Sequence, residues 1–510
     1  MRLKKLVGFL FSRMVIVGLL ILLQFAFIVV SIAYLSTTTI YLYPVLELLS
    51  LAVVLWIVAS QDNPSYKIAW IIAIFVFPLF GGLFYLVWGN KTLNKKMRKK
   101  LEVSVQEGHQ YLEEDSNIRQ ALNELSPQLT VQSDYIRNVS DFPLCRNTTA
   151  RYFKVGEEKF EALKQELMKA KKFILLEYFI LEPGKMWDTV FDILKQKVTE
   201  GVEVRLMYDD VGSLQTLPKI YDKLIQNAGI KLTVFNPFRP RLNAMMNYRD
   251  HRKICVIDGN VGFCGGINLA DEYINVYPKL GHWKDTAVML TGDGVWNFTF
   301  MFLQLWKYES GEDIEFDRYR PTVSCTDAKG FVQPFGDSPL DNYNVSENAY
   351  LHMINRATRY VYITTPYLIL DNEMITALSM AAQSGVDVRI MTPHIPDKWY
   401  VHMVTQSYYK PLLEAGVTIM EYTPGFVHAK MFVVDDRVAI VGTTNLDFRS
   451  LYLHFECGVV FYEAPVIADV KKDILDTLQV CTNITLEVAK QISLPKRILR
   501  SFLRLFAPMM

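Results

Sequence analysis

The sequence contains two copies of one spaced pattern of residues, and this repeat constrains the fold more than any other feature. The copies begin at His251 and His428, which are 177 residues apart. Counted from each histidine, both copies have lysine at +2, aspartate at +7, glycine at +14, asparagine at +17 and leucine at +18. Agreement at six positions indicates a duplicated domain, and the period is too long for a solenoid.

Shorter matches around the two copies extend the repeat. Residues 201–207 (GVEVRLM) resemble residues 385–391 (GVDVRIM). From about residue 150 onward the chain alternates short β-branched runs with amphipathic stretches, which is typical of an α/β fold. We therefore predict two related α/β domains, at residues 150–325 and 326–484.

Each copy of the motif includes an apolar run that predicts a buried strand, at residues 254–257 and 431–434. If the whole motif lies on a strand, positions i and i+2 point to the same face. The histidine and lysine of each copy should then share a face, whereas the aspartate at +7 has the opposite parity. We expect Asp258 and Asp435 to face away from their own histidines.

The histidine and lysine pairs suit chemistry on a phosphate diester. His251 and His428 can act as nucleophile and general acid–base, and Lys253 and Lys430 can neutralise the equatorial oxygens. An unperturbed imidazole pKa of about 6.5 leaves the neutral, attacking form available near neutral pH. The sequence has no HExxH pattern and no CxxC pair, so it suggests neither a catalytic metal nor a thiolate zinc site.

These features resemble the paired HxKxxxxD motifs of the phospholipase D superfamily and, within it, the bacterial cardiolipin synthase family. Further segments carry the resemblance: residues 262–268 (GFCGGIN), 271–273 (DEY), 283–286 (WKDT), 365–367 (TPY) and 442–450 (GTTNLDFRS). The resemblance covers nearly the whole chain and is weakest across residues 1–40 and 95–150. It implies two phospholipase D-like domains with the active site at their interface.

The resemblance also implies a two-step phosphatidyl transfer that needs no metal or other cofactor. One histidine takes the phosphatidyl group from a phosphatidylglycerol and releases glycerol, and a second phosphatidylglycerol accepts the group to give cardiolipin. By analogy we expect His251 to be the nucleophile and His428 the general acid and then base, although the near-symmetry of the copies does not decide between them. Two alternatives stay open: hydrolysis of a phospholipid or nucleic acid on the same scaffold, and a membrane scaffold without activity.

The resemblance assigns roles to ten residues. The catalytic set comprises the six motif residues, namely His251, Lys253, Asp258, His428, Lys430 and Asp435. Within this set, Asp258 and Asp435 should support loops rather than touch phosphorus. The supporting set comprises the acids that orient the histidines, Asp285 and Glu456, and two donors to the phosphate, Asn268 and Asn445.

Two positions depart from the pattern of the family. Lys284 stands where arginine is more usual, and it would lose bidentate geometry if that position binds phosphate. His454 lies in a run, LHFEC, that replaces a more usual Asn-Phe-Glu-x-Asn. We interpret His454 as a polar strand residue, with an additional pocket group as the alternative.

The N-terminal region holds three apolar stretches, at residues 14–35, 41–60 and 68–89. Each is close to the ~20 residues that a membrane-spanning helix needs. We therefore predict a multi-pass protein of the cell membrane, with an anchor of two or three transmembrane helices at residues 1–90 and a polar linker at residues 91–149. Lysine and arginine clusters flank both ends of the anchor, and the positive-inside rule then favours a cytoplasmic catalytic region.

The C-terminal segment, residues 485–510, interleaves basic and large apolar side chains. It is suited either to an anionic bilayer surface or to packing on the catalytic domain. Lys+Arg total 54 and Asp+Glu total 53, so the formal net charge of +1 lacks the basic excess of a nucleic-acid groove. The expected partners are phosphatidylglycerol and an anionic lipid bilayer, without nucleic acid, and the oligomeric state stays open.

Overall fold

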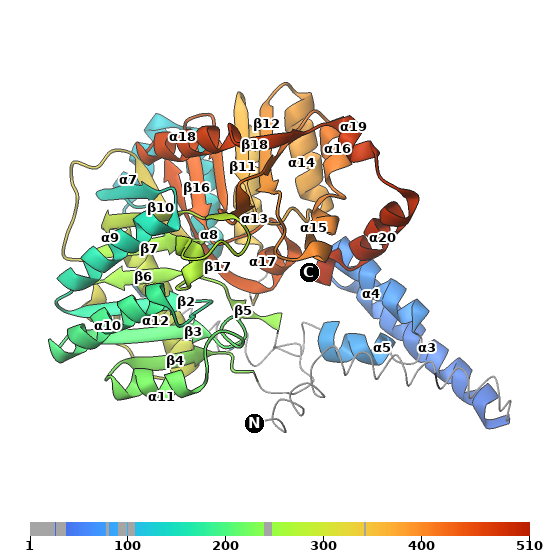
Figure 1. Ribbon diagram of the computed structural model, residues 1–510, viewed down its shortest axis with the longest axis horizontal. Coiled ribbons are helices and arrows are strands. Elements are labelled where there is room, and N and C mark those ends of the chain that lie inside the picture. The colour runs from blue at the N-terminus through green and yellow to red at the C-terminus, as the bar shows by residue number, and fades with distance from the viewer. Residues whose placement is uncertain are drawn as a thin grey trace. The chain divides into compact units, whose positions relative to one another are not determined.

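The computed structural model describes residues 26, 37–77, 81–89, 99, 108–238, 247–340 and 343–509. The chain divides into two compact units. The smaller unit contains the N-terminal helices. The larger unit contains both β-sheets and the C-terminal helices, coloured from teal to red in Figure 1.

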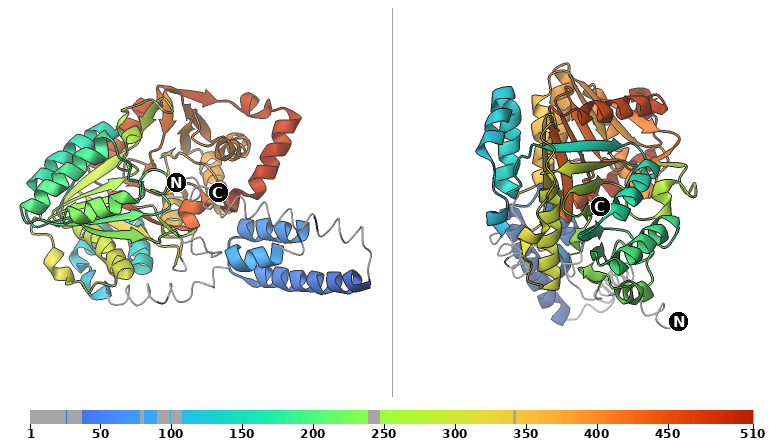
Figure 2. Two further views of the ribbon diagram at one scale, coloured as in Figure 1. Left: turned by 60° about the horizontal axis from the view of Figure 1, so that its bottom comes forward. Right: turned by 90° about the vertical axis from the view of Figure 1, so that its left-hand side faces the viewer.

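The smaller unit contains one long helix of 23 residues and several shorter ones. Those within the described residues are α3 (Thr37–Ala59), α4 (Pro64–Val76), α5 (Gly81–Phe84) and the π-helix η1 (Tyr85–Gly89). The Asn63 side chain caps α4 by accepting a hydrogen bond from the Ser65 N–H at 2.9 Å. Pro64 fits the first turn because a backbone N–H at that position, which proline lacks, would have no acceptor within the helix. Helices α3 and α4 pack side by side (Figure 2) and are joined by a short connection at residues 60–63.

The predicted membrane anchor falls partly outside the described residues. The first apolar stretch, residues 14–35, lies outside them except for Ala26, and residues 78–80 interrupt the third stretch. Among the residues that the structure describes, no helix combines the length and the apolar character needed to cross a membrane.

The larger unit begins with helices inside the segment predicted as a linker. These helices are η3 (His109–Tyr111), α7 (Ser116–Leu125) and α8 (Pro127–Ser140). The side chains of Asp115 and Ser126 cap α7 and α8 by accepting bonds from the Asn117 and Leu129 N–H groups. Helix α8 packs on α13 (Val345–Arg356) and on the second sheet, so this part of the segment belongs to the folded unit.

The first sheet has seven strands in the order β1-β9-β7-β6-β2-β3-β4. Their bounds are β1 (Thr148–Phe153), β2 (Phe173–Tyr178), β3 (Glu203–Asp209), β4 (Lys231–Phe235), β6 (Ile254–Ile257), β7 (Val261–Gly265) and β9 (Ala287–Gly292). The accompanying helices are α9 (Gly156–Lys169), α10 (Lys185–Thr199), α11 (Ile220–Asn227) and α12 (Val295–Ser310). Phe160, Leu163 and Leu167 recur every three or four residues, so α9 presents one apolar side to the core.

The second sheet repeats this order as β10-β17-β16-β15-β11-β12-β13 and adds β18 at its edge. Its strands are β10 (Phe331–Asp337), β11 (Tyr360–Thr364), β12 (Asp387–Pro393), β13 (Thr418–Tyr422), β15 (Met431–Val434), β16 (Val438–Gly442), β17 (His454–Tyr462) and β18 (Cys481–Ile484). Its helices include α13, α14 (Asn372–Gln383), α15 (Trp399–Thr405), α16 (Tyr409–Glu414), α17 (Phe448–Tyr452) and α18 (Val466–Leu478). Equivalent strands taken in chain order occupy equivalent places, which confirms the predicted duplication.

The two halves of the larger unit exchange short strands. Strand β5 (Arg249–Asp250) of the first half pairs in parallel with β17 of the second half. Strand β8 (His282–Lys284) of the first half pairs in parallel with β14 (Gly425–Val427) of the second half. The thiols of Cys264 and Cys457 lie 3.5 Å apart where β7 meets β17. Each exchanged strand lies beside a motif histidine.

The C-terminal helix α20 (Leu494–Leu505) follows α19 (Leu486–Lys490) and packs against α15. Its inward contacts are made by arginines: Arg500 donates to the Gln406 side chain, and the Arg504 guanidinium lies 4.5 Å from the ring centre of Tyr408. The exposed side of the helix and the residue that follows it carry six large apolar residues, Leu494, Ile498, Leu499, Phe502, Leu505 and Phe506. The helix therefore packs on the larger unit, as one predicted alternative required, with contacts from Arg500 and Arg504.

Candidate active site

Both motif histidines lie where the two halves meet. The predicted strands at residues 254–257 and 431–434 are confirmed as β6 and β15. The expectation that the histidines and lysines lie on these strands is wrong, because each strand begins one residue after its lysine. The histidine backbones bond to the other half instead: the His251 N–H donates to the Phe455 carbonyl at 2.9 Å, and the His428 N–H donates to the Lys284 carbonyl at 2.7 Å.

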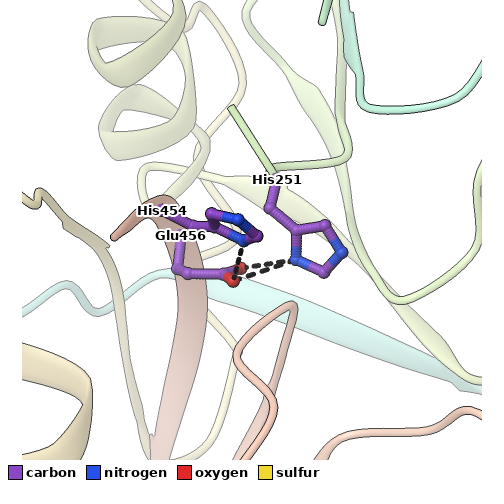
Figure 3. A group of neighbouring side chains, drawn as sticks. All are labelled: His251, His454 and Glu456. Carbon is purple, nitrogen blue, oxygen red and sulfur yellow. Dashed lines mark hydrogen bonds and ion pairs between the residues drawn. The ribbon is translucent and has the colours of Figure 1, made fainter. Parts of the chain in front are cut away.

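Each histidine is bound by a carboxylate from the opposite half of the unit. His251 Nδ1 lies 2.9 and 3.0 Å from the two Glu456 carboxylate oxygens (Figure 3). His428 Nδ1 lies 2.7 Å from Asp285 Oδ2. The histidines are each 7% exposed and both carboxylates are fully buried. A carboxylate at Nδ1 fixes the ring orientation and leaves Nε2 as the nitrogen that can act on a substrate.

The two carboxylates are held by different local contacts. Thr443 Oγ1 donates to Glu456 Oε2. Gly266 follows the first motif at the position that Thr443 has after the second. A side chain at Gly266 would collide with Asp285, because an added Cβ atom would lie 2.1 Å from Asp285 Oδ1. Both residues lie in segments that the sequence singled out, but their contacts with the acids were not predicted.

The lysines lie close to their own histidines, as expected. Lys253 Nζ donates to the His251 carbonyl, and Lys430 Nζ donates to the His428 carbonyl. Lys430 Nζ also lies 2.8 Å from His428 Nδ1. Two lysine amines beside two imidazoles form a buried site suited to a phosphate diester.

Burial keeps both imidazoles neutral near pH 7. Burial, aided by the charges of Lys253 and Lys430, holds the pKa of His251 well below its ordinary value. Burial and the charge of Lys430 lower the pKa of His428 to about 4, although Asp285 opposes the shift. Burial also lowers the pKa of Lys253 to about 8 and that of Lys430 to about 7.

Aromatic rings surround both histidines, and of these rings only Tyr273 and Trp283 lie in segments that carry the resemblance to the family. The ring centre of Phe179 lies 5.0 Å from that of His251. Trp283, Tyr273 and Phe426 place their ring centres 5.4, 5.7 and 5.8 Å from that of His428. Phe179 follows the end of a strand and Phe426 comes two residues before a motif histidine, so only their position beside the motifs could have suggested them. These rings reduce the access of water to the imidazoles.

The motif aspartates point away from the histidines, as the parity argument predicted. Asp258 accepts bonds from the backbone N–H groups of residues 171–173, at the start of β2. Asp435 accepts bonds from the N–H groups of residues 358–360, at the start of β11. Both aspartates have a positive φ, of 53° and 54°, a conformation that aspartate tolerates better than most residues. They hold equivalent turns in the two halves.

The remaining predicted site residues have different surroundings. Asn268 accepts a bond from the Ile180 N–H at 3.0 Å and donates to the Tyr273 hydroxyl at 2.7 Å, so its amide supports the loop around the site. Asn445 is buried, and its Oδ1 has no hydrogen-bond partner among the described residues. Lys284, one of the departures from the family, forms an ion pair with Asp473 at 2.8 Å.

The duplicated sheets and the paired His–Lys motifs define the class of protein, a two-domain member of the phospholipase D superfamily. The family described as "Cardiolipin synthase, PLD-like domain" matches residues 163–277 and 350–477, and the family described as "Phospholipase D-nuclease N-terminal" matches residues 48–90. Both matched regions of the first family contain a motif histidine.

Known relatives narrow this class. An uncharacterised protein of Streptococcus mutans is 45% identical over 462 residues, covering 90% of this chain and 99% of the relative. A cardiolipin synthase of Halalkalibacterium halodurans is 34% identical over 454 residues, covering 88% of this chain and 90% of the relative. The chain therefore belongs to the cardiolipin synthase family of the phospholipase D superfamily.

A solved structure agrees with this assignment at the level of the fold. The phosphatidylserine synthase of Haemophilus influenzae superposes with a TM-score of 0.58 and covers 75% of this chain and 98% of its own. The sequences are 15% identical, so the match concerns the fold alone.

Proposed function

We propose that this protein transfers a phosphatidyl group from one phosphatidylglycerol to another, giving cardiolipin and glycerol. The observation that supports it most is the reciprocal pairing of His251 with Glu456 and of His428 with Asp285 across the two halves. Two oriented imidazoles beside two lysines are the groups that an in-line exchange at phosphorus requires. Relatives at 34% and 36% identity that are named cardiolipin synthases supply the substrate class.

In the first step, Nε2 of His251 attacks the phosphorus of phosphatidylglycerol. A P–N bond forms, the P–O bond to the head-group glycerol breaks, and His428 gives its proton to the departing oxygen, which leaves as glycerol. Lys253 and Lys430 balance the charge on the phosphoryl oxygens. The product of this step is a phosphatidyl-histidine. Glu456 at Nδ1 of His251 favours the tautomer with a lone pair on Nε2, and Asp285 does the same for His428, so the choice of His251 as the nucleophile follows the analogy with the family.

In the second step, a hydroxyl of another phosphatidylglycerol attacks the same phosphorus. His428 accepts the hydroxyl proton, a new P–O bond forms, the P–N bond breaks and neutral His251 is restored. The anionic diester raises the pKa of His428 when it binds, because a nearby negative charge stabilises the imidazolium. This coupling supplies the proton needed in the first step although burial lowers the pKa of His428 in the free enzyme.

The same proposal covers the organisation of the chain. We assign residues 150–325 and 326–484 to the two phospholipase D-like domains and residues 1–90 to a multi-pass anchor in the cell membrane, with the catalytic part in the cytoplasm. The match of residues 48–90 to an N-terminal family supports an appended N-terminal module. The exposed apolar side of α20, next to Lys496 and Arg497, supports contact with an anionic bilayer.

The test uses purified full-length protein in mixed micelles with phosphatidylglycerol. Cardiolipin and glycerol in equal amounts, both absent with His251→Ala, are the expected result. Phosphatidic acid as the main lipid product would replace the synthase proposal with a phospholipase, because water would then be the acceptor. Release of neither product by well-folded protein would leave the family membership intact and remove the proposed activity.

The pKa values of the site predict an unusual pH dependence. The value of kcat/KM for phosphatidylglycerol should decrease as the pH rises, because the protonated form of His428 that the first step needs becomes scarcer above its pKa of about 4. Above about pH 7 to 8 the decrease should become steeper, since Lys430 and Lys253 then lose the charges that bind phosphate. Lowering the pH to about 6 should cause no loss of rate, because the pKa of His251 lies well below its ordinary range and the neutral nucleophile persists there. Initial rates measured between about pH 5 and 10 test both the alkaline decrease and the absence of a loss near pH 6.

Lys430→Arg provides the comparison for this profile. The guanidinium keeps its charge throughout the range, so the alkaline limb should move to higher pH whatever the absolute rate of the variant. An alkaline limb that stays in place, or an acid limb at the ordinary histidine pKa, would contradict the assignment.

A further inference from the structure

A third imidazole, His454, lies beside His251 and belongs to neither motif. Its side chain is buried, and both of its ring nitrogens are without a hydrogen-bond partner among the described residues. His454 Nδ1 lies 3.7 Å from Glu456 Oε1, which is too long for a hydrogen bond. A buried polar group without a partner is unfavourable, so its presence calls for a ligand that the side chain can bind.

His454 completes a set of metal-binding side chains. His251, His454 and Glu456 each offer one ligand atom, and these three atoms lie within 4.8 Å of one another (Figure 3). The two imidazole ring centres are 5.4 Å apart. Two histidines and one carboxylate, with a further position for water, form a set that Zn²⁺ accepts. Thr443 Oγ1 donates a hydrogen bond to the Glu456 carboxylate, as groups outside the direct ligands commonly do at zinc sites.

The order of elements explains why these three groups meet. His454 and Glu456 are two residues apart on β17, so they point to the same side of the strand. His251 reaches them because β5 pairs with β17 and places its backbone next to Phe455. The ligand set therefore exists only in the assembled unit.

We propose that His251, His454 and Glu456 bind a Zn²⁺ ion that inhibits the enzyme. The ion would replace the hydrogen bond between His251 Nδ1 and Glu456, so the ring would lose the carboxylate that orients it and gain a positive charge beside it. Both changes oppose nucleophilic attack by Nε2. The positive charges of Lys253 and Arg449, which lie near the imidazoles, make binding weaker than at a four-thiolate structural site.

The binding experiment uses metal-free full-length protein in detergent, titrated with ZnCl₂ by calorimetry and with Co²⁺ by visible absorption. One ion per chain should bind, and His454→Asn should weaken binding by at least about tenfold. Two variants serve as controls. His352→Asn removes a half-buried histidine on α13 that is distant in sequence from the site. His394→Asn removes the competing pair of His394 with Glu421, whose atoms are 2.8 Å apart.

The outcome is decided by which variant loses the ion. Loss in His454→Asn and retention in both controls supports the proposal. Equal binding by His454→Asn and the unchanged protein, loss in His394→Asn alone, or no binding at all would overturn it. Because binding is measured without turnover, this result does not depend on the proposed function.

The inhibitory effect rests on the proposed function and needs a second measurement. Cardiolipin formation with and without Zn²⁺ is expressed as a ratio for each variant, so any change in basal rate cancels. Zn²⁺ should lower this ratio in the unchanged protein and in His352→Asn, and should lower it much less in His454→Asn. Binding without inhibition would overturn the inhibitory role. Zinc binding by a protein that makes no cardiolipin would overturn the proposed activity and leave the site in place.

Discussion

His251→Ala should lower the rate of phosphatidyl transfer by about 10⁴-fold or more, because the group that forms the covalent intermediate is removed. His428→Ala should cause a loss of similar size for a different reason, since glycerol then departs without a proton. The two losses look alike in a product assay. The rate of cardiolipin formation from phosphatidylglycerol measures both, with the folded state of each variant checked by thermal unfolding.

A substrate with a good leaving group separates the two roles. Phosphatidyl-nitrophenol needs no general acid for departure, so His428→Ala should still release a burst of one nitrophenol per active site, while His251→Ala should release none. The reverse pattern would make His428 the nucleophile. A burst with both variants would show that neither residue carries the phosphatidyl group.

The second large effect concerns the carboxylates, which act through the histidines of the opposite half. Glu456→Gln should slow transfer by about 10²- to 10⁴-fold, because the neutral amide no longer fixes the tautomer or supports the charge of His251. Asp285→Asn should have an effect of comparable size through His428. With the nitrophenol substrate, Glu456→Gln should lose the burst and Asp285→Asn should keep it.

Glu463→Gln provides the matched control for these variants. This carboxylate lies one residue beyond the end of β17 and forms an ion pair with Arg437. Glu456 lies near the opposite end of the same strand. Its replacement should leave the burst and the steady-state rate close to those of the unchanged protein. If Glu456→Gln kept the burst and Asp285→Asn lost it, the cross-half pairing would not describe the working enzyme.

The sequence by itself determined the duplication and the class of the fold, and it predicted the chemistry of the site. Two copies agreeing at six positions predicted two related α/β domains, and the apolar runs after Lys253 and Lys430 predicted β6 and β15 to the residue. The prediction that Asp258 and Asp435 face away from the histidines also agrees with the structure, although its premise, that the histidines lie on the same strands, is wrong. The first two predictions succeeded because they depend on local periodicity and on comparison of the chain with itself.

The tertiary structure decided which acid meets which histidine. Glu456 and His251 are 205 residues apart, and Asp285 and His428 are 143 residues apart, yet each pair is in direct contact. No local pattern encodes such contacts, because they follow from the pairing of β5 with β17 and of β8 with β14. The same pairing brings His454 to His251, and the packing of the two halves, rather than any segment of the chain, creates the site.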